Sequence, residues 1–208
     1  MSTNIKSLKI QIVEKPDWVS WDDIKRCLEE SHSVNRERGI NMIKYRWPVE
    51  KIRESMGVNG VMLVAIDGKK VVGTAALGER ERETWYVKGR YAYMSLACVL
   101  PQYSGCGIYK KLLSRREEIA QSRDYSVFLL DTHEKNTKIQ NIVKSVGYQC
   151  VSYFNVADHY NVMMAKWPAG CPYSETYRKF RVCLSWIDSR IKKLLKPSYR
   201  MVKKIFCN

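Results

Sequence analysis

The stretch LACVLPQYSGCGIYKKLL, residues 96–113, constrains this chain more than any other. An apolar run ends at Pro101, Gly105 and Gly107 follow, and a helical pattern begins at Ile108. A helix N-terminus presents unpaired backbone N–H groups and the positive end of the helix dipole, which together favour an anion. Glycines let a phosphate approach the backbone closely because they lack a Cβ. A simple strand-to-helix turn would also use glycines, so this stretch alone favours neither a phosphate cradle nor a plain turn.

Two familiar phosphate-binding loops are excluded by the spacing. A Rossmann fingerprint needs a third glycine, and Lys110 stands at that position. A Walker loop needs a glycine followed by lysine and Ser or Thr, which this sequence lacks.

The order of predicted elements indicates an α/β fold. Apolar alternation and turn signals predict strands over 7–14, 91–99, 126–132, 149–156 and 160–167, and a hairpin over 61–77 around Asp67-Gly68. Periodicity and caps predict helices from Pro16 to Leu28, over 47–57, 108–122 and 137–146, with polar segments at 30–39 and 78–90. This order predicts a mixed, mostly antiparallel sheet flanked by helices.

The glycine stretch resembles the cofactor motif of the GNAT superfamily of acetyl-CoA-dependent N-acyltransferases. That motif, Gln/Arg-x-x-Gly-x-Gly/Ala after a strand and before a helix, corresponds here to Gln102–Gly107. A second family pattern, which begins with asparagine and ends with glycine and an aromatic residue, fits Asn136, Gly147 and Tyr148. The strand order resembles the GNAT-like acyl-CoA N-acyltransferase fold from about residue 7 to about residue 167.

The resemblance implies that acetyl-CoA is the acyl donor and that no metal is needed. The turn would bind the pyrophosphate of coenzyme A, and the preceding strand edge would pair with the pantetheine arm. The residues implied in cofactor binding are Ala97, Cys98, Val99, Gln102, Tyr103, Ser104, Gly105, Cys106, Gly107, Ile108 and Asn136. A main-chain N–H near Val99 would serve the oxyanion.

The sequence departs from the family at two catalytic positions. The tyrosine that often protonates the leaving thiolate falls on Val143, and the strand position of a glutamate base holds Tyr93. Residues that could move a proton are therefore sought elsewhere. We consider Tyr93, Glu79 in the charged GERERE segment, and His133 after the strand 126–132 as catalytic candidates. A solvated loop for Glu79 and a surface or capping role for His133 remain open.

The acceptor would lie at the segment after the first helix. His32, Asn35 and Arg36, with Arg38, offer donors suited to a sugar, a carboxylate or a phosphate, although a solvated helix end fits the same residues. The prediction is an N-acetyltransferase that acts on the amine of a small acceptor, with an amino-sugar as the leading candidate. The alternative is a catalytically silent CoA-binding or membrane-docking module, which the loss of tyrosine at Val143 would suit.

The cysteines and the N-terminus indicate a cytoplasmic protein. Seven widely spaced cysteines without a CxxC pair favour free thiols over a disulfide framework or a zinc site. The N-terminal stretch MSTNIKSLKI has neither the apolar region nor the cleavage site of a signal peptide.

The net charge of +15 is concentrated towards the C-terminus, where residues 173–208 hold ten Lys/Arg and two acids, or +8. We predict a GNAT-like domain over 5–168 and a basic amphipathic helical tail over 169–208, ended as a helix by Pro197. Residues 177, 180, 184, 187, 191 and 194 form an apolar stripe in it. The stripe could pack on the domain or dock on an anionic membrane surface, such as the inner membrane face. Nucleic acid is a weaker interpretation because no recognition fold accompanies the charge, and a homodimer is a further partner to test.

Overall fold

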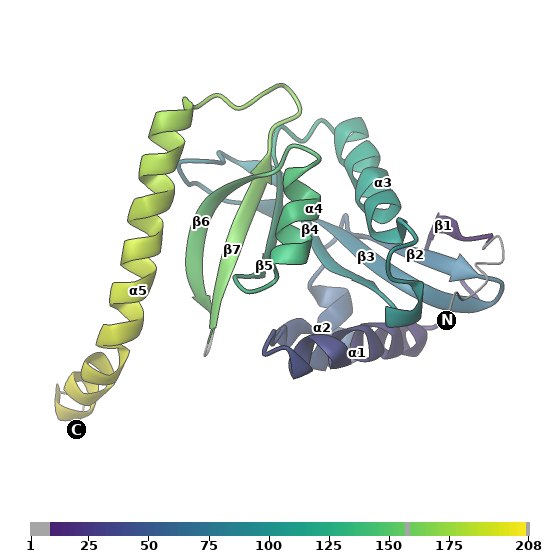
Figure 1. Ribbon diagram of the computed structural model, residues 1–208, viewed down its shortest axis with the longest axis horizontal. Coiled ribbons are helices and arrows are strands. Elements are labelled where there is room, and N and C mark those ends of the chain that lie inside the picture. Colours follow the sequence, from purple (N-terminus) through teal and green to yellow (C-terminus); the bar gives the residue numbers. More distant parts are fainter. Residues whose placement is uncertain (1–8, 157–158, 207–208) are drawn as a thin grey trace. The chain divides into compact units, whose positions relative to one another are not determined.

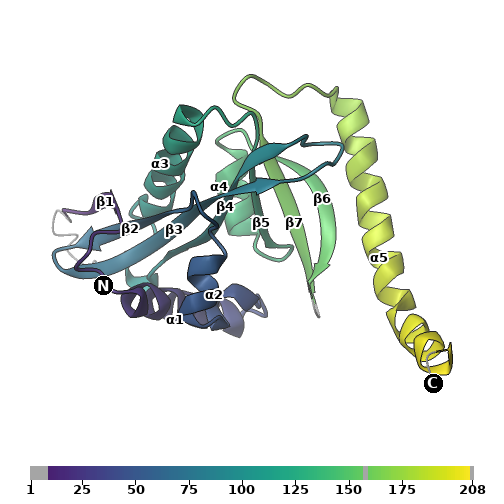
Figure 2. The same ribbon diagram turned by 180° about the vertical axis from the view of Figure 1, so that it is seen from behind.

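The computed structural model describes residues 9–156 and 159–206 (Figures 1 and 2). The chain divides into two compact units, Met1–Leu130 and Asp131–Asn208, and each is described by itself. The strand order of the sheet is β1-β2-β3-β4-β5-β7-β6, which confirms the predicted mixed sheet.

The first unit contains the longest strands. Its elements are β1 (Gln11–Glu14), α1 (Trp21–Glu37), η1 (Ile43–Arg46), α2 (Val49–Glu54), β2 (Val61–Asp67), β3 (Lys70–Glu81), β4 (Arg90–Val99), η2 (Pro101–Tyr103), α3 (Ile108–Ser122) and the start of β5 (Phe128–His133). Strands β1 to β4 pair antiparallel in chain order, and β4 pairs with β5 in parallel. Helices α1 and α2 lie on one side of this sheet and α3 lies on the other (Figures 1 and 2).

The second unit contains the end of β5 and four further elements. These are α4 (Thr137–Lys144), β6 (Gln149–Val156), β7 (His159–Lys166) and α5 (Glu175–Phe206). Strands β6 and β7 form an antiparallel hairpin, and α5 runs beside β6 (Figure 1). The predicted turn at Ala157 and Asp158 lies outside the described residues, as do positions 7 and 8 of the first predicted strand.

The first helix differs from its prediction at both ends. It begins at Trp21, where Ser20 and Asp23 form a reciprocal capping box, rather than at Pro16. It then continues to Glu37, through the polar segment predicted to follow it. Only one side of this helix is buried, and its buried residues are Ile24, Cys27, Leu28 and Ser31. The polar residues on the other side can therefore be helical while their side chains lie in solvent.

The charged segment after the central hairpin is also partly regular. Strand β3 extends to Glu81, which pairs with Arg90 of β4. The first residues of the segment 78–90, which was predicted to be a loop, therefore belong to a strand. Three other predictions are confirmed: the turn at Asp67-Gly68, strand β4, and helix α3, whose bounds are those predicted.

Helix α5 continues beyond Pro197 to Phe206, so the prediction that this proline ends the helix is wrong. A proline inside a helix removes one N–H donor and favours a kink, but the residues on either side can remain helical. The predicted boundary between 168 and 169 stays a prediction.

Polar contacts attach α5 to β6, the last strand in the sheet order. The Tyr153 N–H donates to Ser185 Oγ at 2.8 Å, and the same hydroxyl lies 3.0 Å from the Tyr153 carbonyl. Asn155 Nδ2 donates to the Ser189 carbonyl at 2.8 Å. An edge strand leaves backbone groups without a partner strand. The serine-bearing face of α5 therefore packs on β6 because it can bond groups that an apolar face would leave unsatisfied.

Candidate active site

A bulge in β4 distinguishes the predicted cofactor strand from its neighbours. Thr74 of β3 pairs with Cys98, but Ala76 pairs with Ser95, so two residues of β4 face one residue of β3. Leu96 sits in this bulge with a φ of 51°, a conformation that costs a non-glycine residue energy. The buried hydroxyl of Thr74 donates to the Leu96 carbonyl at 2.8 Å, which stabilises the bulge.

A buried arginine supports the same region from helix α3. Arg116 is 1% exposed, and its Nη1 lies 3.3 Å from the Ala76 carbonyl and 3.4 Å from the Ser95 carbonyl. Helix α3 begins at the glycine turn, so this contact ties the helix that follows the turn to the strand that precedes it. The helical spacing of Leu112, Arg116 and Ile119 in the sequence is typical of one helix face, but it does not reveal which carbonyls the guanidinium contacts.

From the residue before the bulge onward, the edge of β4 that faces β5 is not used by that strand. The parallel pairing covers Ala92 to Met94 against Phe128 to Leu130, and the described residues of β5 pair with no later residue of β4. The stretch from Ser95 to Val99 therefore offers a strand edge to another extended chain. This is the edge where the sequence predicts the pantetheine arm, with Ala97 and Val99 half-buried along it.

The glycine turn has the geometry of an anion cradle. Gly105 and Gly107 have φ values of 88° and 74°, and a Cβ at either position would meet no atom within 4 Å. Gly107 caps α3 without a side-chain hydrogen bond, and the first turn of the helix contains no acid. In the described part of the chain, the turn's backbone bonds use the N–H groups of 103, 104 and 106, whereas those of 105 and 107 bond no carbonyl. Open backbone donors at a helix N-terminus fit a pyrophosphate.

Two of the predicted cofactor residues have structural partners. The Tyr103 hydroxyl donates to Asp67 Oδ2 at 2.9 Å, and this bond raises the pKa of Tyr103. The Cys98 side chain is buried, with its Sγ 3.9 Å from Cys27 Sγ and 3.2 Å from Thr74 Oγ1. Tyr103 thus anchors the turn to the β2–β3 hairpin, and Cys98 can serve a cofactor only through its backbone. Gln102, Ser104 and Cys106 lie on the surface of the turn, and Ile108 is buried beneath it.

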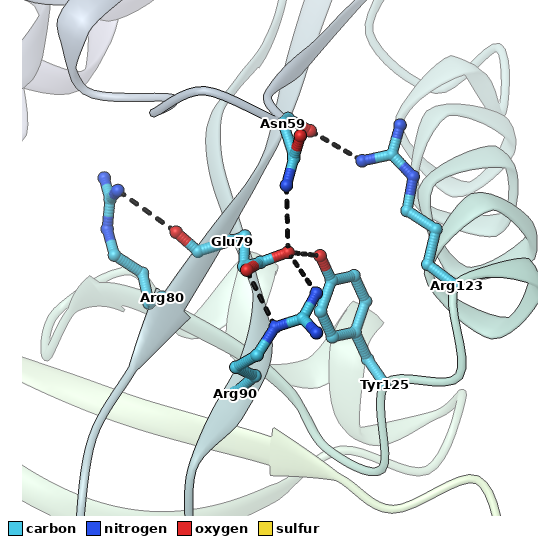
Figure 3. Close-up of polar contacts among 6 residues, drawn as sticks. All are labelled: Asn59, Glu79, Arg80, Arg90, Arg123 and Tyr125. Carbon is cyan, nitrogen blue, oxygen red and sulfur yellow. Dashed lines mark hydrogen bonds and ion pairs between the residues drawn. The ribbon is translucent and has the colours of Figure 1, made fainter.

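Glu79 stands at the centre of a polar network (Figure 3). Arg90 donates to both of its carboxylate oxygens, at 2.8 Å and 2.7 Å, and the Tyr125 hydroxyl and Asn59 Nδ2 add further bonds. The hydrogen bonds from Arg90 and Tyr125 lower the pKa of Glu79 to about 2. A carboxylate held ionised in this way is a weak base whose lone pairs are already engaged, so the network favours a structural role.

Tyr93 instead lies beside two cations. Lys44 Nζ donates to the Tyr93 hydroxyl at 2.8 Å and stands 4.8 Å from the ring centroid. The Arg80 guanidinium lies 5.9 Å from the same centroid. The Lys44 bond holds the phenol oxygen in place, and the O–H of the phenol is itself a hydrogen-bond donor.

The predicted acceptor residues gather around the buried ring of Tyr45. His32 stacks on this ring at 5.5 Å, and the guanidinium groups of Arg36 and Arg46 each lie 5.4 Å from its centroid. Asn35 Nδ2 lies 3.1 Å from His32 Nδ1, and burial lowers the pKa of His32 to about 4. The result is a neutral imidazole and two guanidinium groups around one ring, which we call the Tyr45 cluster (His32, Asn35, Arg36, Tyr45 and Arg46).

The remaining candidates lie in the second unit. His133 is buried, accepts a hydrogen bond from the Lys135 N–H at its Nδ1 and stacks on His159 at 4.6 Å. Asn136 caps α4 by accepting from the Ile139 N–H at 3.4 Å. Both residues therefore have structural roles here, and their catalytic and cofactor roles stay predictions.

Sequence reasoning missed several residues of the first unit. Charged and aromatic side chains alternate in the stretch Lys44-Tyr45-Arg46-Trp47. This alternation was visible in the sequence but did not enter the predictions. Thr74 offered no such signal, because a threonine in a strand is ordinary. In the described residues no three His, Cys, Asp or Glu side chains cluster as metal ligands would, and no helix could cross a membrane.

Comparison with known proteins settles the family. The model of the acetyltransferase (GNAT) family matches residues 21–148, which is most of the chain and includes the bulge and the glycine turn. The chain belongs to the GNAT acetyltransferase family. It is accordingly an N-acetyltransferase, an enzyme of a family that transfers an acyl group from acyl-CoA to an amine.

Solved structures share the fold of this GNAT protein at low identity. An acetyltransferase from Streptococcus agalactiae is 19% identical with a TM-score of 0.59, over 76% of this chain and 98% of that one. The ribosomal-protein-S18-alanine N-acetyltransferase from Escherichia coli is 13% identical with a TM-score of 0.58, over 80% and 97%. A chain of the NatC complex bound to Gag peptide and CoA is 13% identical with a TM-score of 0.59, over 76% and 98%. No curated protein sequence matches the chain.

Proposed function

We propose that this GNAT protein transfers the acetyl group of acetyl-CoA to the amine of a small acceptor that carries a negative charge, with a phosphorylated or acidic amino-sugar as the leading candidate. The observation that carries the proposal is the Tyr45 cluster. Its arginines stack on an aromatic ring, and none of the ion pairs among the described residues engages Arg36 or Arg46. Guanidinium groups held in this way are suited to a phosphate or a carboxylate.

The cofactor fits the residues that are present. The open N–H groups of Gly105 and Gly107 would hold the pyrophosphate, and the free edge of β4 would hold the pantetheine arm. When bound, acetyl-CoA supplies the activated thioester. The N–H groups beside the β4 bulge are suited to the developing oxyanion, because the bulge turns them away from regular pairing with β3.

Tyr93 is our candidate for the group that supplies a proton to the departing thiolate. Lys44 Nζ donates to its oxygen at 2.8 Å, and the usual tyrosine position is taken by Val143, which is buried and apolar. The amine needs to lose a proton as well. His32 lies among the predicted acceptor residues, but its pKa of about 4 makes it a weak base, so we propose that water carries this proton away.

Acetyl transfer from acetyl-CoA should be measured by thiol release, with a panel of amines as acceptors. Glucosamine 6-phosphate, glucosamine, spermidine and a short peptide with an N-terminal alanine separate negative charge, sugar, positive charge and peptide. We expect the phosphorylated sugar to be the best of the four and spermidine the poorest. Arg46→Gln should raise the KM for the phosphorylated sugar and leave the KM for acetyl-CoA unchanged.

Preference for the peptide or for spermidine would refute the acidic acceptor. The peptide arm matters because the Escherichia coli neighbour is named for an alanine of ribosomal protein S18. A protein that binds CoA in calorimetry but turns over no acceptor and hydrolyses no thioester would instead support the catalytically silent module.

A further inference from the structure

Helix α5 carries most of the exposed large apolar side chains of the described structure. They are Tyr177, Phe180, Leu184, Trp186, Ile187, Ile191, Leu194 and Leu195, each between 40% and 76% exposed. Among the other described residues, only Trp18 and Val58 are large apolar side chains of similar exposure. Except for Trp186, the residues on α5 recur at spacings of three and four and share one side of the helix, which we call the outer stripe.

The outer stripe is exposed because the opposite side of the helix is the one that packs. Ser185 Oγ and the Ser189 carbonyl bond β6 on that side. Arg190 lies at the flank between the two sides, held by an ion pair with Glu134 at 2.7 Å and by the ring of Tyr160 at 3.7 Å. On an ideal helix at 100° per residue, Ser185 and Ile187 point about 160° apart. The helix therefore cannot bury both faces on one strand.

Basic residues flank the outer stripe. From Glu175 to Leu195 the helix holds six Lys/Arg and two acids, a net charge of +4, and residues 196–208 add four Lys/Arg and no acid. The two acids are paired within the helix, Glu175 with Lys179 and Asp188 with Lys192. Long basic side chains beside an apolar stripe can extend their charged ends to a polar boundary while their stems stay on apolar surface.

Three occupants could cover such a stripe, and the charge distinguishes them. A second copy would bring one basic helix against another of the same charge, which is unfavourable. An acidic protein would satisfy the charge but would need an apolar groove along about 27 Å of helix, at 1.5 Å per residue over Tyr177–Leu195. An anionic lipid surface satisfies both requirements, because it offers apolar chains beneath negative headgroups along any length.

We propose that α5 lies in the plane of an anionic lipid surface, with the outer stripe among the acyl chains and the basic flanks at the headgroups. The helix is attached to the second unit by its serine face, so docking requires no unfolding. Membrane attachment is independent of the acetyl transfer proposed above.

Sedimentation of the full-length protein with vesicles tests this surface. Mixed phosphatidylglycerol and phosphatidylcholine vesicles should bind the protein, pure phosphatidylcholine should bind it much more weakly, and binding should fall as salt rises. The triple variant Phe180→Ser, Ile187→Ser and Ile191→Ser should lose about tenfold or more in affinity for each side chain. Lys179→Gln and Lys192→Gln should each lose about fivefold.

The matched control is the double variant Trp18→Ser and Val58→Ser, which removes exposed apolar side chains elsewhere and should bind vesicles as the parent does. Thermal melts should show all variants folded, because the replaced side chains are exposed. If the triple variant melts early, Leu194→Ser with Leu195→Ser provides a second test of the same stripe.

Equal sedimentation of the stripe variants and the control would overturn the proposal, as would equal binding to neutral and anionic vesicles. A dimer in light scattering that the triple variant disperses, without vesicle binding, would identify a second copy as the occupant. Binding to polyglutamate that the triple variant loses, again without vesicle binding, would identify an acidic protein.

Discussion

Replacing Gly105 by glutamate should abolish cofactor binding, because it places a carboxylate where the pyrophosphate of coenzyme A is expected. The site has room, since a Cβ there would meet no atom within 4 Å, so the effect is electrostatic rather than steric. Two like charges about 4 Å apart repel by about 1 kcal/mol in water and about 4 kcal/mol at an effective dielectric constant near 20. For each phosphate charge this corresponds to a loss of between about fivefold and about a thousandfold in affinity.

The same substitution also strains the backbone, because Gly105 has a φ of 88°. A non-glycine residue in that region costs about 1–2 kcal/mol of stability. Gly89→Glu is the matched control, since Gly89 has a φ of 74° and open space around its Cβ position but lies between β3 and β4. Calorimetry with CoA and thermal melts of both variants separate the two effects. Undiminished CoA binding by Gly105→Glu, or an equal loss in Gly89→Glu, would refute the anion cradle.

Three further predictions concern titration and proton transfer. The folded-state pKa of Glu79 is lowered from 4.5 to about 2, so the ionised Glu79 stabilises the fold fully above pH 4.5. This contribution is lost as the pH falls from 4.5 towards 2. Glu79→Gln should therefore flatten the dependence of the melting temperature on pH in that window. The pKa of His32 is lowered from 6.5 to about 4, so the unfolded state binds more protons between these two pH values. The free energy of unfolding should therefore fall as the pH drops from 6.5 to 4. Denaturant melts of His32→Gln should lack this fall. Tyr93→Phe should reduce kcat by about a hundredfold or more if its hydroxyl is the acid, whereas Tyr91→Phe on the same strand should not, as measured by thiol release.

The glycine turn and the helix after it were predictable because their determinants are local. A strand, a proline, two glycines and an apolar period of 3.6 lie within eighteen residues, and α3 has the predicted bounds. The bulge in β4 was not predictable in this way. It depends on the Thr74 hydroxyl and on Arg116, which reach the strand from β3 and α3, and no pattern within β4 records those contacts.

The catalytic candidates illustrate the same limit. Glu79 and His133 were selected as residue types near strand ends and Tyr93 as a residue of the cofactor strand, which sequence can give. Whether a carboxylate is able to act as a base depends on partners distant in the chain, and Tyr125 lies 46 positions from Glu79. The alternation of Lys44, Tyr45 and Arg46 was readable, but its meaning required the stacked ring of His32.

The positive charge of this chain serves at least two different purposes, which composition alone could not separate. The proposed pyrophosphate cradle uses backbone N–H groups, so cofactor binding does not need many lysines and should respond weakly to salt. The arginines of the Tyr45 cluster are exposed, but they stack on a buried ring and so hold their charges in a fixed place. Lys179 and Lys192 of α5 are exposed and pair with acids of their own helix, the arrangement that salt screens most strongly. A net charge of +15 is therefore compatible with an enzyme that binds small anionic molecules. More than half of that charge lies in the last 36 residues, which are distant in sequence from the glycine turn.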